Sequence, residues 1–424
     1  MKVLYPVIGL LSVAMFFPFS AAAQEVYKPR PDAFPPAVEP TPKAVTMATT
    51  VDEMAAWDRY PTYETYLAMM SRWTEEFPTL CHVDTIGISI QGRLILSMYI
   101  EPQTDDDLYR PEFFYSSTIH GDEVTGYVMM LRLIDTLLHG YGTNEQYTRI
   151  INTTRISINP LSNPDGTYRG GNNTVQGAWR YNANFVDLNR TYPNPFNPAK
   201  SEVPHENQLM IDYMSAHQFR LSANLHGGAE VANYPWDSFT SAQNPHPAAD
   251  WWQQVCRRFV DTLRVYAPNR FRDVTSSGYV AGGDWYVITG GRQDYMNYYH
   301  NCLELTLEIS TQKTLSSDRL PEYWSFLQPS LVNYIDEIHS LPESSGIEDS
   351  PLSTLHAPLI VYPNPVVDRL TVDGIAPGST LMLYDMQGRL LLSQNVYNTL
   401  DVSGLPSGVY LLSVGERKKI ILKL

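Results

Sequence analysis

From Tyr60 to Leu341 the sequence alternates short apolar runs with longer amphipathic stretches, and this alternation restricts the fold more than any other feature. The apolar runs predict strands over residues 82–89, 93–101, 113–120, 154–161, 220–226 and 302–310. The amphipathic stretches predict helices over residues 62–77, 123–138, 206–217, 251–266 and 322–341. Strands that alternate with helices of this length predict an α/β fold, in which a mixed, mostly parallel sheet lies between helices.

The segments on either side of this α/β unit have a different composition. Residues 1–23 join a basic residue, an apolar run and an Ala-rich end, which predicts a signal peptide that is removed on export. Residues 24–57 are rich in Pro, Ala and Thr and predict a linker or a short pro-segment, before a unit that spans 58–341. Ser, Pro and acidic residues in 342–357 predict a second linker, and short alternating strands in 358–424 predict a small all-β sandwich.

The charge and the cysteines exclude several classes of protein. The net charge is −15 at pH 7, and no stripe of Lys or Arg is present. Nucleic-acid binding needs such a stripe, so no nucleic-acid partner is expected. No segment after the signal peptide is apolar enough for a transmembrane span, so none is expected in the mature protein. Cys81, Cys256 and Cys302 allow one disulfide at most, and whether Cys256 and Cys302 pair is left open.

Two histidines and one glutamate stand at or just after the ends of predicted strands. His120 ends the run 113–120, and Glu123 follows three residues later, a spacing that puts both on one face of a helical turn. His226 ends the run 220–226 and is followed by two glycines, which let a ligand approach the backbone closely. Functional residues gather at the carboxyl ends of parallel strands. Two His and one Glu are a ligand set of catalytic zinc, which keeps a fourth position for water.

Four further charged residues are suited to chemistry beside such a metal. Glu308 lies near the end of the last predicted strand and is a candidate general base. Asp187 is a candidate partner for a ligand histidine, and Arg180 and Arg190 lie in an Asn-rich loop suited to anions. Each residue alone also has an ordinary interpretation as a satisfied core residue or a surface charge.

Five segments resemble motifs of the zinc metallocarboxypeptidases, in particular of their regulatory, carboxypeptidase N/E-like branch. They are HGDE at 120–123, NPDG at 163–166, RYNANFVDLNRTYP at 180–193, LHGGAEVANYPWD at 225–237 and WYVITGGRQDYMNYYHNCLELTLEIS at 285–310. The resemblance covers roughly residues 58–340, and it is specific because five separate motifs coincide in the right order.

For the metal, the resemblance implies that His120, Glu123 and His226 bind one zinc ion per chain. It implies that Glu308 acts first as general base and then as general acid. It also implies that Asp187 hydrogen-bonds a ligand histidine. The five residues named here are also the candidates that their residue types and positions had indicated before the resemblance was considered.

For the substrate, the resemblance implies that Arg180 polarises the scissile carbonyl and holds the developing oxyanion. It implies that the terminal carboxylate of the substrate is held by Asn189, Arg190 and Tyr286. A residue that satisfies these three groups must end a chain, so the implied activity is that of an exopeptidase.

The resemblance also implies a pocket for the departing residue, lined by Asp237 and Gln293. An enclosed carboxylate attracts Lys or Arg and disfavours Glu or Asp, whereas an exposed Asp237 would be an ordinary loop charge. The chain departs from the family at Asp122, where Asn or Arg is usual. A carboxylate at this position would either weaken the polarisation of the carbonyl or point away.

The C-terminal segment resembles the sorting domain of proteins exported by type IX secretion. The resemblance rests on YPNPVVDRLTV at 362–372, LYDMQGRLLLS at 383–393 and LDVSGLPSGVYLLSV at 400–414. It implies export across the outer membrane by a secretion machinery, followed by surface attachment or by release after cleavage of this domain. The alternative is a carbohydrate-binding or adhesive sandwich.

Together these patterns predict a secreted or surface-attached zinc carboxypeptidase, outside the outer membrane, that removes the last residue of peptides or proteins and prefers Lys or Arg. Two alternatives stay open, a cell-wall peptide amidase on the same fold and a non-catalytic surface binding protein. Asp237 argues against the amidase, and the complete set of catalytic residues argues against the binding protein. Serine hydrolases and HExxH proteases are excluded, because neither G-x-S-x-G nor H-E-x-x-H occurs in the chain.

Overall fold

The computed structural model describes residues 45–103, 108–194 and 203–342, and most of residues 360–423. The predicted signal peptide lies outside the described residues, as do the first part of the N-terminal linker and nearly all of the second linker. Within the described ranges, no helix is long and apolar enough to cross a membrane. The three cysteines are free and buried, so Cys256 and Cys302 are not joined.

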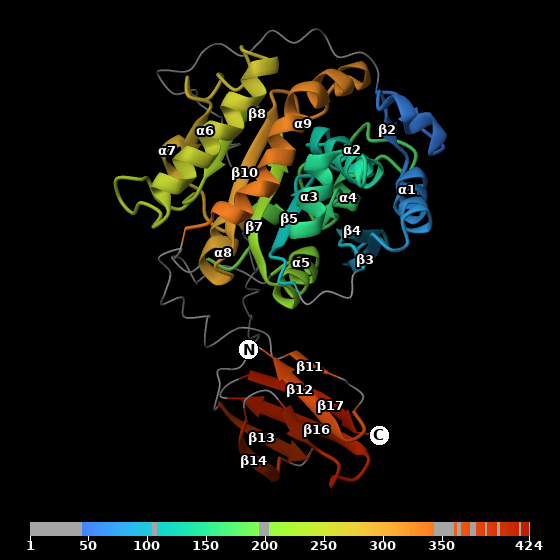
Figure 1. Cartoon of the computed structure of the whole chain (residues 1–424), viewed down its shortest axis with the longest axis vertical. Coiled ribbons are helices and arrows are strands. Elements are labelled where there is room, and N and C mark those ends of the chain that lie inside the picture. Colours follow the sequence, from blue (N-terminus) through green and yellow to red (C-terminus); the bar gives the residue numbers. More distant parts are fainter. Residues whose placement is uncertain are drawn as a thin grey trace, which may run out of the picture.

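An eight-stranded sheet lies at the centre of the N-terminal part of the structure (Figure 1). In spatial order its strands are β3 (Cys81–Ile88), β4 (Leu94–Ile100), β6 (Arg155–Asn159), β5 (Glu112–Ser117), β7 (Phe219–His226), β10 (Leu303–Ser310), β8 (Ala229–Tyr234) and β9 (Tyr279–Ala281). The block β6-β5-β7-β10 is parallel, as is the pair β8-β9, and the other three contacts are antiparallel. The predicted mixed, mostly parallel sheet is confirmed.

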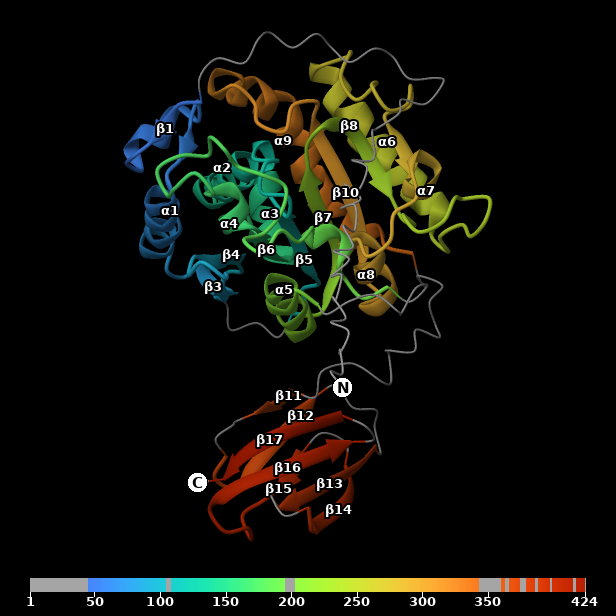
Figure 2. The same ribbon diagram turned by 180° about the vertical axis from the view of Figure 1, so that it is seen from behind.

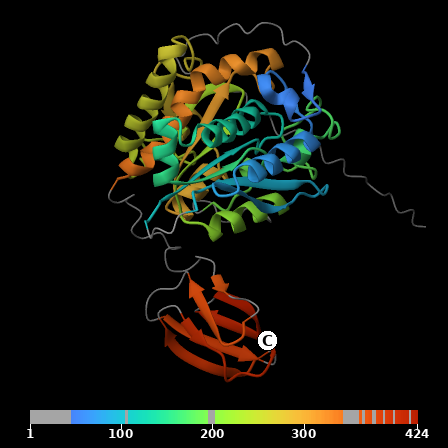
Figure 3. The ribbon, with the colours of Figure 1, turned by 45° about the vertical axis from the view of Figure 1, so that its right-hand side comes forward.

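Helices cover both faces of this sheet, and Figure 3 shows α2 and α9 (teal and orange) on one side of the strands and α5 (green) on the other. The first layer contains α1 (Tyr63–Glu76), α2 (Thr125–Gly140), α3 (Glu145–Thr153), α6 (Ala249–Tyr266) and α9 (Leu320–Asp336), and the second contains α5 (His205–Ala216) and α8 (Arg292–Tyr299). Strand β5 serves both layers, because Phe113 and Tyr115 pack in the first core and Phe114 in the second. This follows from the alternation of side chains along a strand.

Several elements were missing from the sequence interpretation, among them α3, β8, β9 and α8. All six residues of β8 are buried, so the strand lacks the alternation of polar and apolar residues that identifies a half-exposed strand. Helix α8 carries Arg292 and Asp294, whose charges are typical of a surface, yet both are buried. Their burial is possible because each has polar partners within the fold, which the sequence does not reveal.

Part of the predicted N-terminal linker belongs to the folded unit. Strand β1 (Met47–Ala48) pairs in parallel with β2 (Tyr60–Pro61), and Asp52–Ala56 form a short 3-10 helix. Ala48 and Met54 are buried in the same core as α1. The α/β unit therefore includes described residues that precede position 58.

The C-terminal strands form two antiparallel sheets, drawn in red in Figure 2. The first contains β11 (Ile360–Tyr362), β12 (Arg369–Asp373) and β15 (Thr399–Asp401), and the second contains β14 (Leu390–Val396), β13 (Ser379–Asp385), β16 (Gly408–Val414) and β17 (Arg417–Lys423). Leu370 of the first sheet and Leu383 and Leu412 of the second share one apolar core. The all-β character predicted for this segment is confirmed.

Candidate active site

The carboxyl ends of three neighbouring parallel strands bring the predicted site residues together. Strand β7 lies between β5 and β10, and in its register with β10 His226 stands opposite Glu308. The chain leaves β5 at Ser117, so His120 and Glu123 come directly after the strand on the other side. Because parallel strands end at the same edge of a sheet, residues almost 200 positions apart in sequence meet there.

His120, Glu123 and His226 form a compact, buried cluster of donor atoms. Glu123 Oε2 lies 3.0 Å from His120 Nδ1 and 2.8 Å from His226 Nδ1, and the two Nδ1 atoms are 3.1 Å apart. Burial lowers the pKa of His226 to about 4, which keeps its ring neutral. Burial raises the pKa of Glu123, but the two imidazoles beside it bring the pKa well below its usual value. Two histidines and one carboxylate converging on one point fit a zinc ion.

The outward nitrogen of each ligand histidine has its own partner. His120 Nε2 lies 3.2 Å from Asp187 Oδ1, and a terminal nitrogen of Arg180 lies 3.2 Å from His120 Nδ1. His226 Nε2 lies 2.9 Å from the side-chain amide of Asn224. Such partners orient the ring and turn the free nitrogen toward a metal. Asp187 was predicted; Asn224 was missed, because a polar residue on a strand carries no signal of its own.

Glu308 has the environment of a general base. It is half-buried, its Oε2 atom is buried, and no hydrogen-bond partner for that atom exists among the described residues. Burial and the neighbouring Glu123 raise the pKa of Glu308 well above its usual value, while Lys313 and Arg180 act in the opposite direction. A carboxylate with a raised pKa and a free oxygen is suited to exchanging a proton.

Arg180 lies over the metal donors. Its Nε donates to Asp187 Oδ2 at 2.8 Å, and one terminal nitrogen is 3.7 Å from Glu123 Oε1. Burial alone would raise the pKa of Asp187, but His120, Arg180 and Arg190 bring it well below its usual value, so the Asp187 carboxylate stays ionised. The guanidinium is thereby fixed beside the donor atoms of His120 and Glu123.

The three predicted carboxylate-binding residues converge beside this arginine. Arg190 donates to the backbone oxygen of Asn189 at 2.9 Å, and within the described ranges no carboxylate lies within 4.0 Å of its guanidinium. Asn189 Oδ1 accepts from the backbone N–H of Arg292 at 2.9 Å, and its amide nitrogen Nδ2 lies 3.5 Å from His226 Nε2. Tyr286 follows α7 (Gly282–Trp285), and burial and Glu308 raise the pKa of Tyr286, so its hydroxyl keeps its proton. These groups match the hydrogen-bonding needs of a carboxylate.

Asp237 and Gln293 are both buried among polar groups. Asp237 is 4% exposed and accepts from Asn233 Nδ2 at 3.1 Å, and Gln293 is 1% exposed and accepts from the backbone N–H of Thr306 at 2.7 Å. Within the described residues, the amide nitrogen of Gln293 and the amide oxygen of Asn233 have no partner. Burial and the nearby Asp294 raise the pKa of Asp237 to about 8. The enclosed carboxylate of the sequence interpretation is present, and the exposed loop charge is not.

A glycine makes room for the Asp237 carboxylate. A Cβ atom on Gly282 would lie 1.9 Å from Asp237 Oδ1 and 2.7 Å from Asn233 Oδ1. Contacts this short are impossible, so a larger residue at 282 would displace the Asp237 carboxylate. Gly282 was missed in the sequence, where it is one glycine of a pair in an ordinary turn.

Asp122, the unusual residue beside the ligands, is paired with a lysine. Its Oδ2 lies 3.1 Å from Lys313 Nζ, which is also 3.2 Å from Glu123 Oε1. The backbone oxygen of Lys313 accepts from the N–H of Val124 at 2.9 Å. This hydrogen bond joins the turn after β10 to the segment that carries His120 and Glu123. The negative charge of the Asp122 carboxylate is therefore matched by the positive charge of Lys313.

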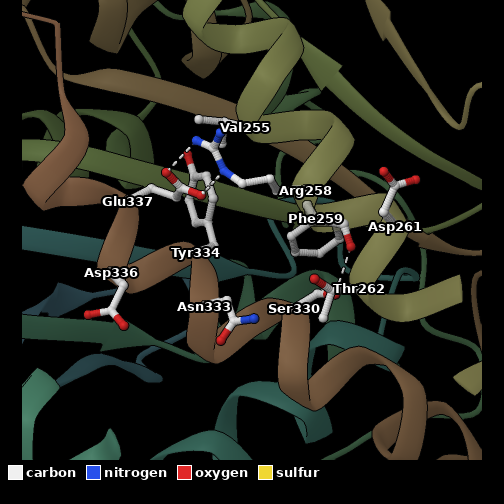
Figure 4. A pocket seen from close by; sticks show the side chains of 10 residues that line it. All are labelled: Val255, Arg258, Phe259, Asp261, Thr262, Ser330, Asn333, Tyr334, Asp336 and Glu337. Carbon is white, nitrogen blue, oxygen red and sulfur yellow. Dashed lines mark hydrogen bonds and ion pairs between the residues drawn. The ribbon is translucent and has the colours of Figure 1, made fainter. Parts of the chain in front are cut away.

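A cavity of about 410 Å³ lies elsewhere, between α6 and α9 (Figure 4). Two of its charged groups pair with each other, since Arg258 makes two hydrogen bonds of 2.7 Å to Glu337, and Ser330 donates to the backbone oxygen of Phe259. None of the predicted site residues lines it. The strand-end cluster, and not this cavity, carries the chemistry.

Comparison with known proteins decides the family. The sequence model of zinc carboxypeptidases matches residues 66–330. Carboxypeptidase M of Mus musculus is 30% identical over 365 residues, which cover 81% of this chain and 79% of that protein. The chain belongs to the zinc carboxypeptidase family. It is accordingly a metallocarboxypeptidase, a hydrolase whose metal is zinc, and the donor set of two histidines and one glutamate fits that ion.

Other zinc carboxypeptidases show similar likeness. The human carboxypeptidase N catalytic chain is 31% identical over 66% of this chain and 69% of its own length. Mouse carboxypeptidase D is 31% identical over 295 residues, and this chain spans only about a fifth (21%) of its length. The crystal structure of thrombin activatable fibrinolysis inhibitor has a TM-score of 0.58 at 15% identity over 68% of this chain and 76% of that one, which shows a shared fold.

A second family match covers the C-terminal strands. The model of a secretion system C-terminal sorting domain matches residues 360–424. The carboxypeptidase is therefore a protein secreted by the type IX route, as its C-terminal motifs predict. The alternative of a carbohydrate-binding or adhesive sandwich is not supported by this match.

Proposed function

We propose that this secreted zinc carboxypeptidase removes a C-terminal Lys or Arg from peptides or proteins. The observation that carries the preference is the buried Asp237; among the described residues the nearby Asn233 Oδ1 and Gln293 Nε2 have no partner. A buried carboxylate without a cationic partner is costly, and a basic side chain of the substrate supplies that partner. An acidic side chain would instead meet repulsion.

Hydrolysis follows from the positions of Glu308 and Arg180. When bound by His120, Glu123 and His226, zinc lowers the pKa of a water molecule and polarises the scissile carbonyl. Glu308 accepts a proton from the attacking water at its free Oε2 and later returns it to the departing amine. Arg180 holds the oxyanion with a guanidinium that Asp187 has fixed in advance.

Exopeptidase action follows from the groups that hold the substrate's end. Arg190 supplies a cation without a carboxylate partner in the described part of the chain, Asn189 supplies an amide nitrogen and Tyr286 a protonated hydroxyl. Only a free terminal carboxylate satisfies all three. An internal peptide bond has no such group at this distance from the scissile carbonyl.

The specificity is tested with peptides that differ only in their last residue. Mass spectrometry of the zinc-loaded protein is expected to show loss of one terminal Lys or Arg, with Phe, Leu and Glu left in place. Loss of apolar residues instead would overturn the role of Asp237 and keep the hydrolytic mechanism. No loss from any peptide, with zinc in the site, would overturn the proposal and direct the next assay to cell-wall peptides.

We further propose that the protein acts outside the outer membrane and is either attached to the cell surface or released after its C-terminal region is cleaved. Support comes from the sorting domain at 360–424 and from the predicted signal peptide at 1–23. The expected mature enzyme carries a catalytic domain near residues 58–341 and, if attached, the domain near 358–424. Intact mass of the cell-associated and medium fractions decides between attachment and release.

A further inference from the structure

We infer that Arg292 is a positioning residue that holds both the metal ligand His226 and the substrate-binding Asn189. The inference rests on the proposed roles of these two residues. Arg292 begins α8, on the face of the sheet opposite α2 and α9, and does not itself reach the metal donors. It acts through two separate sets of hydrogen bonds.

The guanidinium of Arg292 is fixed by a buried ion pair. Arg292 and Glu304 are both 0% exposed, and they share two hydrogen bonds, from Nε to Oε1 at 2.9 Å and from a terminal nitrogen to Oε2 at 3.0 Å. Glu304 also accepts from the Ser222 hydroxyl at 2.7 Å, and the ring of Phe114 lies 5.2 Å from the guanidinium carbon. A bidentate pair enclosed in this way leaves the guanidinium one orientation.

The first set of hydrogen bonds leads from the side chain to the metal ligand. The other terminal nitrogen of Arg292 donates to Ser116 Oγ. Ser116 Oγ donates to Asn224 Oδ1 across 3.3 Å, and Asn224 Nδ2 lies 2.9 Å from His226 Nε2. Ser116 and Asn224 are both 0% exposed, so no water competes for these bonds. Asn224 presents Nδ2 to His226 Nε2, and it fixes the orientation of the His226 ring only while its own Oδ1 is held by Ser116.

The second set runs through the backbone. The N–H of Arg292, the first residue of α8, donates to Asn189 Oδ1 at 2.9 Å. Such an N–H has no partner within its own helix and is free to do this. Because the side chain of Arg292 is fixed by Glu304, the start of α8 is fixed as well. The Asn189 amide therefore turns its nitrogen, and not its oxygen, toward the metal site, where Nδ2 lies 3.5 Å from His226 Nε2.

Packing alone does not require a charged pair at this place. Burying two charges costs free energy of desolvation, and apolar residues of similar volume often replace such pairs without loss of stability. An apolar pair would fill the same space but would not donate to Ser116. A role in stability and a role in positioning thus predict different results for an apolar replacement.

The test compares three variants. Arg292→Met with Glu304→Leu removes the ion pair and keeps the volume. Ser116→Ala removes the connection to Asn224 and keeps the ion pair. Arg258→Met with Glu337→Leu is the control, because this bidentate pair lies in the cavity between α6 and α9, away from the site (Figure 4).

The main readout is the rate at which a chelator removes zinc, which needs no substrate. We expect both Arg292→Met/Glu304→Leu and Ser116→Ala to lose zinc about 10-fold to 100-fold faster than the wild type, with zinc-free proteins that melt as the wild type does. KM for a good peptide should rise in the first variant only, since the Asn189 contact persists in Ser116→Ala. The control should match the wild type in both measurements.

Unchanged zinc loss in Ser116→Ala would overturn the inference, even if the double variant failed to fold. Equal acceleration in the control would overturn it too, because any lost ion pair would then have the same effect. If the wild type cleaves no peptide, the proposed function fails, but zinc loss still decides whether Arg292 positions His226.

Discussion

The preference for basic residues should depend on pH in a way that the buried Asp237 dictates. Burial raises the pKa of Asp294, but Asp294 also accepts hydrogen bonds from the backbone N–H groups of Asp237 and Ser238, at 2.8 and 2.9 Å, which favour its ionised form. Burial and the charge of Asp294 then raise the pKa of Asp237 to about 8. Below that pH the pocket holds a neutral acid, and above it a carboxylate that attracts Lys and Arg.

The size of the effect follows from this pKa. With a pKa of about 8, roughly 3% of Asp237 is ionised at pH 6.5 and roughly 76% at pH 8.5. The value of kcat/KM reports groups of the free enzyme, so for a peptide ending in Arg it should rise by up to about 25-fold over this interval. A peptide ending in Leu makes no use of the Asp237 carboxylate, so its kcat/KM should not show this rise.

The assay measures kcat/KM for a matched pair of peptides, one ending in Arg and one in Leu, at half-unit steps of pH. Their ratio removes the titration of Glu308 and of the metal-bound water, which both substrates share. In Asp237→Asn the ratio should be low and independent of pH, since the amide does not ionise. A ratio that stays constant in the wild type would refute the assignment of Asp237 as the selecting group.

The other predictions concern the base, the pocket and the metal. Replacing Glu308 by Gln should lower kcat about 100-fold or more while zinc stays bound, and full activity in that variant would refute its role as base. Gly282→Ala should raise KM for peptides ending in Arg by about 10-fold, because its Cβ would displace Asp237. Gly404→Ala is the control, because a Cβ at that position meets nothing within 4 Å. Equal KM values for Gly282→Ala and the wild type would contradict the account. Removing zinc should abolish hydrolysis and lower Tm, and added zinc should restore both, since an ion that binds only the folded state stabilises it; an unchanged Tm would show that no ion had been bound.

The sequence predicts the strand-end residues well and their supporting partners poorly. His120, Glu123 and His226 stand at the ends of recognisable apolar runs, so the parallel sheet alone places them together. Asn224 and Arg292 lie inside a strand and a helix, and only the register of β5, β7 and β10 shows which partners they meet. No local pattern contains that information, because the contacts join residues far apart in the chain.

Burial on both faces explains the elements that the sequence does not reveal. Strand β8 carries no alternation of polar and apolar residues, since all its residues are buried, although one of them, Asn233, contacts Asp237.

The described residues before position 58 were assigned to a linker by their composition, yet Ala48 and Met54 pack in the main core. Composition measures an average over a segment, whereas a few well-placed apolar residues suffice to anchor it.

The most direct test of the central claim, hydrolysis of the last peptide bond, uses two peptides that end in Arg and differ only in a free or an amidated C-terminus. The account predicts that the free acid loses its Arg and that the amide is cleaved about 100-fold more slowly or not at all, because Arg190 would face a neutral group. Glu308→Gln measured in parallel identifies any cleavage by a contaminating enzyme. Equal rates on the two peptides would contradict the account, since the site would then not recognise the end of a chain.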